Sequence, residues 1–279
     1  MNIDLHIRTR IKQYFFKKFG IRILKEKHQE FFGKKFRLIG MKIKIDYETG
    51  WLIELAKNSE IIFDVGCNIG QSAVLLNAFT SIKSIFLFEP NPYALAICTE
   101  NAILNGFSDK IKLFNYCISN ECTKEKEFFT VLSGAAGSLD PSFARTAKNM
   151  NSSFKVGLIT LDKIINKEKV IPDFVKVDVE GHEFEVLSGS NELVKLRKTK
   201  FLVEMHSSPT LSMSANCRNI LDWANKHNYI VVYLKEMKII EEPDCIGNRG
   251  RCHLLLAPDD FVINPELKAI KQGSFIPKT

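Results

Sequence analysis

Carboxylate and imidazole side chains gather at two places where the sequence predicts that a buried strand ends. Asp178 and Glu180 follow one apolar run, and Glu204 and His206 end the next. The alternate spacing of Glu204 and His206 puts both side chains on one face of an extended strand. Because ligands of open parallel sheets bind outside the carboxyl ends of the strands, we expect Asp178, Glu204 and His206 to lie near one another beside a crevice.

Two interpretations assign chemistry to this group. His206 or a carboxylate can be a general base on a substrate hydroxyl, a role that suits the near-neutral pKa of histidine. The same side chains can instead hold a divalent cation that binds and acidifies the hydroxyl. A third interpretation gives Glu204 and His206 only hydrogen bonds at a strand end. We predict Asp178, Glu204 and His206 as catalytic residues without a metal, and interpret His182 and Glu183 as a structural helix start.

A glycine-punctuated turn joins another apolar run to a predicted helix. Residues 61–70 read Ile-Ile-Phe-Asp-Val-Gly-Cys-Asn-Ile-Gly, and residues 71–79 place apolar side chains at helical spacing. The three-glycine spacing of a dinucleotide turn is absent, and Asp64 stands where a pyrophosphate would be repelled. A carboxylate there suits a ligand with an amino group. Asn68 tolerates the positive φ that a middle glycine would adopt.

A second strand, predicted over residues 83–89, ends in Glu89. An acidic residue at this strand tip binds ribose hydroxyls in doubly wound sheets. The two acidic strand tips, Asp64 and Glu89, therefore favour a positively charged, ribose-containing ligand.

Five motifs in this order resemble the FkbM-type family of class I S-adenosylmethionine-dependent methyltransferases, and the resemblance covers residues 60–258. The motifs are Asp64–Gly70, Phe88–Pro92, Thr160–Asp162, Lys176–Glu183 and Glu204–His206. Cys67 stands where the family usually has alanine, which is a change between small residues.

The resemblance implies a Rossmann-like α/β fold, with a mostly parallel sheet of seven strands closed by an antiparallel hairpin at residues 229–234 and 252–257. It implies S-adenosylmethionine as the cofactor and a hydroxyl of a sugar, glycan or other natural product as the methyl acceptor. Asn115, at the end of a third predicted strand over residues 110–118, falls where related enzymes hold the adenine ring. The predicted cofactor-binding residues are Asp64, Gly66, Asn68, Gly70, Glu89, Asn91 and Asn115.

Two other functions compete with this one. The basic N-terminus fits a nucleic-acid methyltransferase, but the Asn/Asp-Pro-Pro-aromatic run of enzymes that act on exocyclic amines is absent after Asp178. The similar run at residues 91–93 follows the wrong strand. A non-catalytic S-adenosylmethionine-binding module would need only the cofactor side, so the presence of Asp178, Glu204 and His206 argues against it.

The composition is that of a globular α/β protein with a basic N-terminal appendage. The chain has 279 residues, of which 45% are hydrophobic and 25% charged, and a net charge of +7. Residues 1–45 contain 13 Lys and Arg against 3 acidic residues. Residues 3–19 predict a basic amphipathic helix, which either docks on the domain or contacts an anionic membrane. We divide the chain into this segment (1–45), a methyltransferase domain (46–265) and a peripheral tail (266–279).

Other features bear on the compartment and on an insertion. Seven scattered cysteines without a C-x-x-C pair indicate reduced thiols, and the N-terminus lacks the apolar run of a signal peptide. We therefore predict a cytoplasmic protein, at most peripheral to a membrane. Residues 120–160 break the strand–helix alternation with predicted strands at 126–132 and 154–159. The long loop between them makes this either a surface hairpin or a lid over the substrate.

Overall fold

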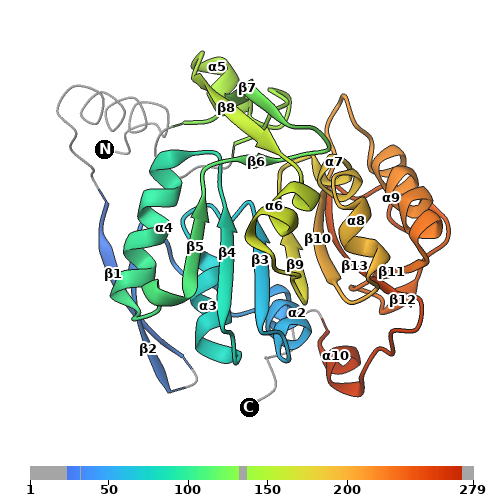
Figure 1. The fold of residues 1–279 in the computed structure, drawn as a ribbon, viewed down its shortest axis with the longest axis horizontal. Coiled ribbons are helices and arrows are strands. Elements are labelled where there is room, and N and C mark those ends of the chain that lie inside the picture. The colour runs from blue at the N-terminus through green and yellow to red at the C-terminus, as the bar shows by residue number, and fades with distance from the viewer. Residues whose placement is uncertain (1–23, 32, 132–136, 272–279) are drawn as a thin grey trace.

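The computed structural model describes residues 24–31, 33–131 and 137–271, so the predicted basic helix over residues 3–19 lies outside the described part. A central sheet of eight strands organises the molecule (Figure 1). In chain order its strands are β3 (Ile61–Val65), β4 (Ser84–Phe88), β5 (Ile111–Phe114), β9 (Phe174–Val177), β10 (Lys200–His206), β11 (Tyr229–Tyr233), β12 (Lys238–Ile239) and β13 (Arg251–Pro258).

The sheet has the predicted class I methyltransferase arrangement, with one additional strand. The order is β12-β11-β13-β10-β9-β3-β4-β5. The five strands from β10 to β5 are parallel, and β13 runs antiparallel to both β10 and β11. This confirms the Rossmann-like α/β fold and its antiparallel closing hairpin. The predicted count of seven strands was wrong, because the two-residue β12 pairs with the outer edge of β11.

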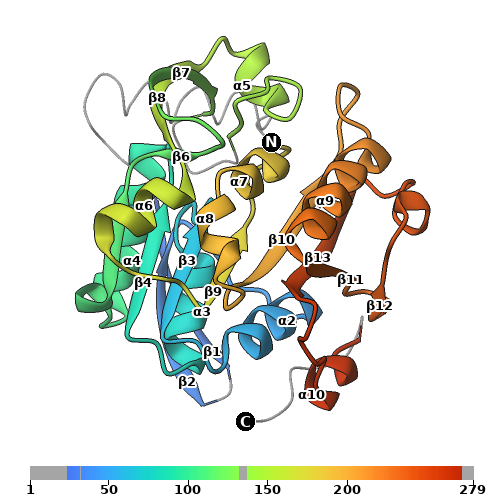
Figure 2. The same cartoon turned by 45° about the vertical axis from the view of Figure 1, so that its right-hand side comes forward.

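Helices cover both faces of the sheet, and two hydrophobic cores lie between the layers. Figure 2 shows α6 and α8 in front of β3 and β4, and α3 behind them. Alternation along β3 explains the two layers, because Phe63 and Val65 belong to one core and Ile62 to the other. The helices are α2 (Tyr47–Ala56), α3 (Gln71–Phe79), α4 (Pro92–Leu104), α5 (Arg145–Asn149), α6 (Leu161–Glu168), α7 (Glu183–Ser188), α8 (Asn191–Lys195), α9 (Met213–His227) and α10 (Pro265–Ala269).

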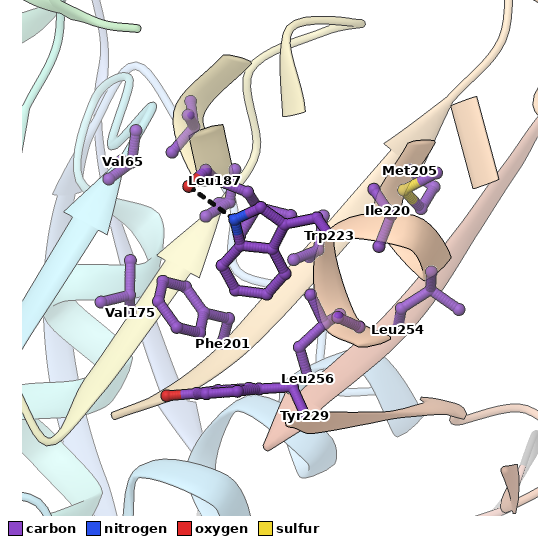
Figure 3. Close-up of a cluster of buried hydrophobic side chains, with 14 of the residues drawn as sticks. Val65, Val175, Leu187, Phe201, Met205, Ile220, Trp223, Tyr229, Leu254 and Leu256 are labelled. Carbon is purple, nitrogen blue, oxygen red and sulfur yellow. Dashed lines mark hydrogen bonds between the residues drawn. The ribbon is translucent and has the colours of Figure 1, made fainter. Parts of the chain in front are cut away.

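Trp223 on α9 fastens this helix to the sheet and to α7 (Figure 3). Its ring lies 5.8 Å from Phe201 in an edge-on arrangement and 5.5 Å from Tyr229. The indole Nε1 donates a hydrogen bond of 3.0 Å to the carbonyl of Leu187. A buried indole needs such an acceptor for its N–H group. The contact fixes α7 and β10 relative to each other.

The turn after β3 packs directly on the turn after β9. Gly66 has a φ of +81°, and a Cβ on it would lie 1.9 Å from the carbonyl oxygen of Asp178. Asn68 adopts the predicted positive φ, at 47°. Gly70, at the start of α3, has a φ of +89° and lies against Cys98. The glycines therefore let the backbone of another segment approach closely and let the turn adopt positive φ angles, as their spacing predicts.

The insertion between β5 and α6 forms a second small sheet. It contains β6 (Cys117–Ile118), β7 (Thr123–Phe129) and β8 (Ser153–Ile159). The β7–β8 hairpin was predicted. The single strand predicted over residues 110–118 was wrong, because the chain leaves the central sheet after β5 and enters this second sheet at β6. Ser138 of the insertion donates a 2.9 Å hydrogen bond to the carbonyl of Glu180, so the insertion touches the turn after β9.

An N-terminal hairpin and a C-terminal helix complete the domain. Strands β1 (Glu26–Phe31) and β2 (Lys34–Ile39) pair antiparallel, where the sequence predicts an edge strand or hairpin. The side chain of Asn101 on α4 bonds to both the N–H and the carbonyl of Ile39. Ile270 is buried, and its carbonyl accepts from Nε1 of Trp51 on α2. Along the described part of the chain, every helix is too short or too polar to cross a bilayer.

A glycine substitution tests the contact between the two turns. We expect Gly66→Ala to lower the free energy of unfolding by on the order of 3 kcal/mol or more, because the new Cβ would overlap a backbone carbonyl that cannot move independently. Gly106→Ala is the matched control, since Gly106 also has a positive φ, at +70°, but faces open space. It should cost about 1 kcal/mol. Equal losses in urea unfolding would contradict this reading of the turn.

Candidate active site

Two cavities meet at the carboxyl ends of the parallel strands. The larger, of about 610 Å³, lies between the turn after β3, the ends of β9 and β10, and residues 42–52. The smaller, of about 80 Å³, lies between Glu89 and the insertion, which contributes Phe128 and Leu139. Gly66, Asn68, Asp178 and Glu180 line both cavities. The place where the cavities adjoin is therefore flanked by the glycine turn on one side and the turn after β9 on the other.

The predicted cofactor residues divide into those that line a cavity and those that support it from below. Gly66 and Asn68 line both cavities, and Glu89 lines the smaller one. Neither cavity is lined by the others, Asp64, Gly70, Asn91 and Asn115. Asn91 caps α4, and Asn115 donates to the carbonyls of Glu89 and Pro90.

Glu89 is a buried carboxylate held by backbone N–H groups. Its two oxygens accept from the N–H of Asn68 at 3.0 Å and of Asn91 at 2.8 Å. Burial raises the pKa of Glu89 to about 7, although these two hydrogen bonds act in the opposite direction. Glu89 also lines the smaller cavity.

Asp64 is fully buried beneath the turn. One of its oxygens accepts from the hydroxyl of Ser72 on α3, and the other, Oδ1, has no hydrogen bond and lies 3.8 Å from Nζ of Lys176. Burial raises the pKa of Asp64, and Lys176 opposes that shift. Lys176 also contacts Asp178 at 3.0 Å. Lys176, to which the sequence assigns no role, joins the two acidic strand ends. Its place one residue before the end of β9 is the signal that could have revealed it.

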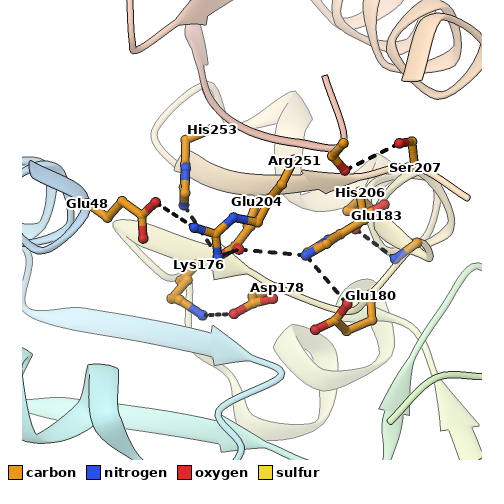
Figure 4. Close-up of polar contacts among 12 residues, drawn as sticks. Glu48, Lys176, Asp178, Glu180, Glu183, Glu204, His206, Ser207, Arg251 and His253 are labelled. Atoms are coloured by element: carbon orange, nitrogen blue, oxygen red, sulfur yellow. Dashed lines mark hydrogen bonds and ion pairs between the residues drawn. The ribbon is translucent and has the colours of Figure 1, made fainter. Parts of the chain in front are cut away.

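The structure brings the three predicted catalytic residues together (Figure 4). One donor atom from each of Asp178, Glu204 and His206 lies within 4.8 Å of the other two. Nε2 of His206 is 3.6 Å from Oε1 of Glu204 and 3.5 Å from Oε2 of Glu180. The alternation along β10 and the parallel neighbour β9 produce this grouping, as the spacing predicts.

Glu183, interpreted from the sequence as part of a structural helix start, orients His206. It is completely buried, and Oε1 accepts from Nδ1 of His206 at 2.8 Å and from the N–H of Gly181 at 2.9 Å. Its other oxygen accepts from the amide of Asn216 on α9 at 3.0 Å. Burial lowers the pKa of His206, but Glu183 and the carboxylate of Glu180 outweigh it and raise the pKa to about 9.

Glu204 is surrounded by cationic and imidazole groups. Arg251 contacts it at 2.8 Å and His253 at 3.4 Å. Burial alone would raise the pKa of Glu204, but His253, Lys176 and Arg251 together lower it to about 2. Arg251 also reaches Glu48 on α2 at 2.8 Å. His253 lies opposite Glu204 in the antiparallel pair of β10 and β13. The sequence could not reveal this contact, because it does not give the register of the two strands.

Comparison with known proteins places this site in context. The model of the Methyltransferase FkbM domain matches residues 64–231. Hexuronic acid methyltransferase AglP of Haloferax volcanii is 31% identical over 166 residues, which are 56% of this chain and 60% of AglP. The match therefore spans less than two thirds of that relative. The 2-O-methyltransferase NoeI of Sinorhizobium fredii is 28% identical over 203 residues, which are 69% of this chain and 81% of NoeI.

A solved structure also aligns with the chain. It is a methyltransferase FkbM from Methylobacillus flagellatus KT, with a TM-score of 0.45 and 18% identity over 72% of this chain and 44% of that one.

The raised pKa of Glu89 makes stability depend on pH. An unfolded glutamate loses its proton near pH 4.5, whereas Glu89 in the fold keeps it until about pH 7. Its contribution to the free energy of unfolding is therefore complete below pH 4.5 and is lost as the pH rises to about 7. Relative to Glu89→Gln, we expect wild type to lose about 3 kcal/mol between about pH 5 and about pH 8 in urea unfolding. Parallel pH profiles of the two proteins would contradict this.

Proposed function

This chain belongs to the FkbM methyltransferase family, and we propose that it transfers the methyl group of S-adenosylmethionine to a hydroxyl of a sugar. The observation that carries the proposal is the grouping of Asp178, Glu204 and His206 beside the glycine turn, at the junction of two cavities. The names of the relatives support a sugar acceptor, since one is a hexuronic acid methyltransferase and the other a 2-O-methyltransferase.

The smaller cavity fits the nucleoside part of the cofactor. Glu89 offers carboxylate lone pairs suited to ribose hydroxyls, and Phe128 and Leu139 supply apolar surface suited to the adenine side. The insertion forms one wall of this cavity, so its position sets the room that a nucleoside has there. This supports the lid interpretation of residues 120–160.

Asp64 has a supporting role in this proposal. Since it is fully buried and lines neither cavity, it acts on the cofactor through its partners Ser72 and Lys176. Gly70, Asn91 and Asn115 likewise hold the turn and the segment after β4 in place.

The larger cavity fits a polar acceptor. Many of the side chains that line it are charged, among them Lys42, Lys44, Glu48 and Arg251. S-adenosylmethionine, when bound, supplies a methyl group that is already electrophilic. The chain must therefore orient an acceptor oxygen in line with that group, and such alignment can account for about 7–11 kcal/mol of the barrier. Asp178 and Glu204 are placed to hold the acceptor hydroxyl while its proton leaves.

The compartment also remains a proposal. All seven cysteines are free thiols, and five of them are buried. Free thiols are what a reducing cytoplasm maintains, so we propose a cytoplasmic enzyme. Contact of residues 1–19 with an anionic membrane stays a prediction, because those residues lie outside the described part of the chain.

A product assay tests the proposed function. The full chain, incubated with methyl-labelled S-adenosylmethionine, should label uronate-containing or neutral oligosaccharides as methyl ethers identified by mass spectrometry. Transfer RNA serves as the competing acceptor, because the basic N-terminus also fits a nucleic acid. Labelling of RNA alone would overturn the proposal. Tight cofactor binding without transfer to any hydroxylated acceptor would indicate a binding module instead.

A substitution tests the role of Asp178. We expect Asp178→Asn to lower kcat by about 100-fold or more, because an amide lacks the negative charge that holds the acceptor hydroxyl while its proton leaves. Glu60→Gln is the matched control: Glu60 is an exposed carboxylate paired with Lys83 at 2.8 Å, away from both cavities. Equal kcat values for the two variants, with unfolding midpoints unchanged, would remove Asp178 from the catalytic residues.

A further inference from the structure

We infer that Asp178, Glu204 and His206 form a binding site for a divalent metal cation at the acceptor end of the larger cavity. Glu183 is the carboxylate that orients the histidine ligand. The inference deepens the proposed function, but cation binding can be measured without turnover, so the two can fail separately.

The spacing of the donor atoms suits one ion. A carboxylate oxygen from each of Asp178 and Glu204 and a ring nitrogen of His206 lie within 4.8 Å of one another. Metal–ligand bonds of about 2.0–2.4 Å allow two ligands of one ion to lie up to about twice that distance apart. The three donors can therefore meet at one point with small side-chain movements. They come from the ends of two paired parallel strands, β9 and β10, which hold them in place.

The state of His206 is the independent observation that points to a cation. Its residue surface is only 8% exposed, and Nδ1 donates to Glu183. Among the described residues, Nε2 makes no hydrogen bond and has only the longer ion-pair contacts with the carboxylates of Glu180 and Glu204, at 3.5 and 3.6 Å. A histidine that ligates a metal characteristically donates its other N–H to a carboxylate, which fixes the ring and the tautomer.

The fold holds Glu183 in a position that orients the ring of His206. It is fully buried, and besides His206 it is held by the N–H of Gly181 and the amide of Asn216. These bonds come from the turn after β9 and from α9. A carboxylate fixed from two elements orients the imidazole far better than a mobile surface side chain could.

The charge balance around the site also favours a cation. Carboxylates outnumber the permanent cations here by four to two. A protonated His206 adds a third positive charge, and a metal bound at Nε2 would take the place of that proton. The carboxylates are Asp178, Glu180, Glu183 and Glu204, and the cations are Lys176 and Arg251. Buried carboxylates that are not fully compensated are costly, and a divalent ion would supply the missing charge.

The neighbouring cations leave room for the ion. Of the two oxygens of Asp178, Lys176 contacts Oδ2, and in the described structure no residue donates to Oδ1. Arg251 contacts Oε1 of Glu204, but each carboxylate oxygen has two lone pairs. Asp178 and Glu204 both line the larger cavity, so an acceptor hydroxyl can reach the same point. A divalent cation held there would lower the pKa of that hydroxyl.

Titration with Mn²⁺ tests the site on the full chain after treatment with a chelator. The electron paramagnetic resonance signal of free Mn²⁺ should report one bound ion per chain. We expect Glu204→Gln and His206→Asn to weaken binding at least tenfold. Glu183→Gln, which removes no ligand, should weaken it by about 10–100-fold, as loss of an orienting carboxylate does in other metal sites.

Controls separate the possible outcomes. Glu60→Gln should bind Mn²⁺ like wild type. Circular dichroism should show that each variant is folded. If Glu183→Gln is unfolded, the Mn²⁺ affinities of Glu204→Gln and His206→Asn test the site. Absence of binding at millimolar Mn²⁺, or binding that none of the site variants weakens, would overturn the inference. Mn²⁺ binding in a protein that labels no sugar would leave the site standing and remove the proposed function.

Discussion

The close approach of two backbone turns is the constraint on which the site depends. Gly66 leaves no room for a side chain against the carbonyl of Asp178, and the N–H of Asp178 donates to Val65 at 3.0 Å. These contacts hold the end of β9 against the glycine turn after β3. Since Gly66 and Asp178 both line the two cavities, one backbone contact sets the distance between the walls of the proposed site.

Charge compensation is the second requirement, because several carboxylates converge at the same strand ends. Lys176 stands between Asp64 and Asp178, and Arg251 stands between Glu204 and Glu48. Without such partners, buried carboxylates would take up protons or destabilise the fold. Lys176 joins two neighbouring strands, whereas Arg251 connects the sheet to α2, and both of its partners line the larger cavity.

Local sequence patterns predicted most of the fold. Contacts between residues far apart in the sequence could not be predicted from them. The apolar runs and glycines located β3, β4, β9 and β10, and alternation along β10 placed Glu204 beside His206. The sequence could not show that the chain leaves the sheet after Phe114, because β5 and β6 differ in partner strand and not in residue type. Glu183 was missed for the same reason, since its partners His206 and Asn216 lie 23 and 33 positions away.

The turn after β9 also links the insertion to the acceptor side. Ser138 of the insertion bonds to the carbonyl of Glu180, and the carboxylate of the same residue lies 3.5 Å from Nε2 of His206. Glu180 and Gly181 both have positive φ angles, at 51° and 90°. Glu180 also lines both cavities, so a single residue contacts the insertion through its carbonyl and His206 through its carboxylate. We infer that a displacement of the insertion can reach His206 through Glu180, which gives a short path by which occupancy of one cavity can alter the other.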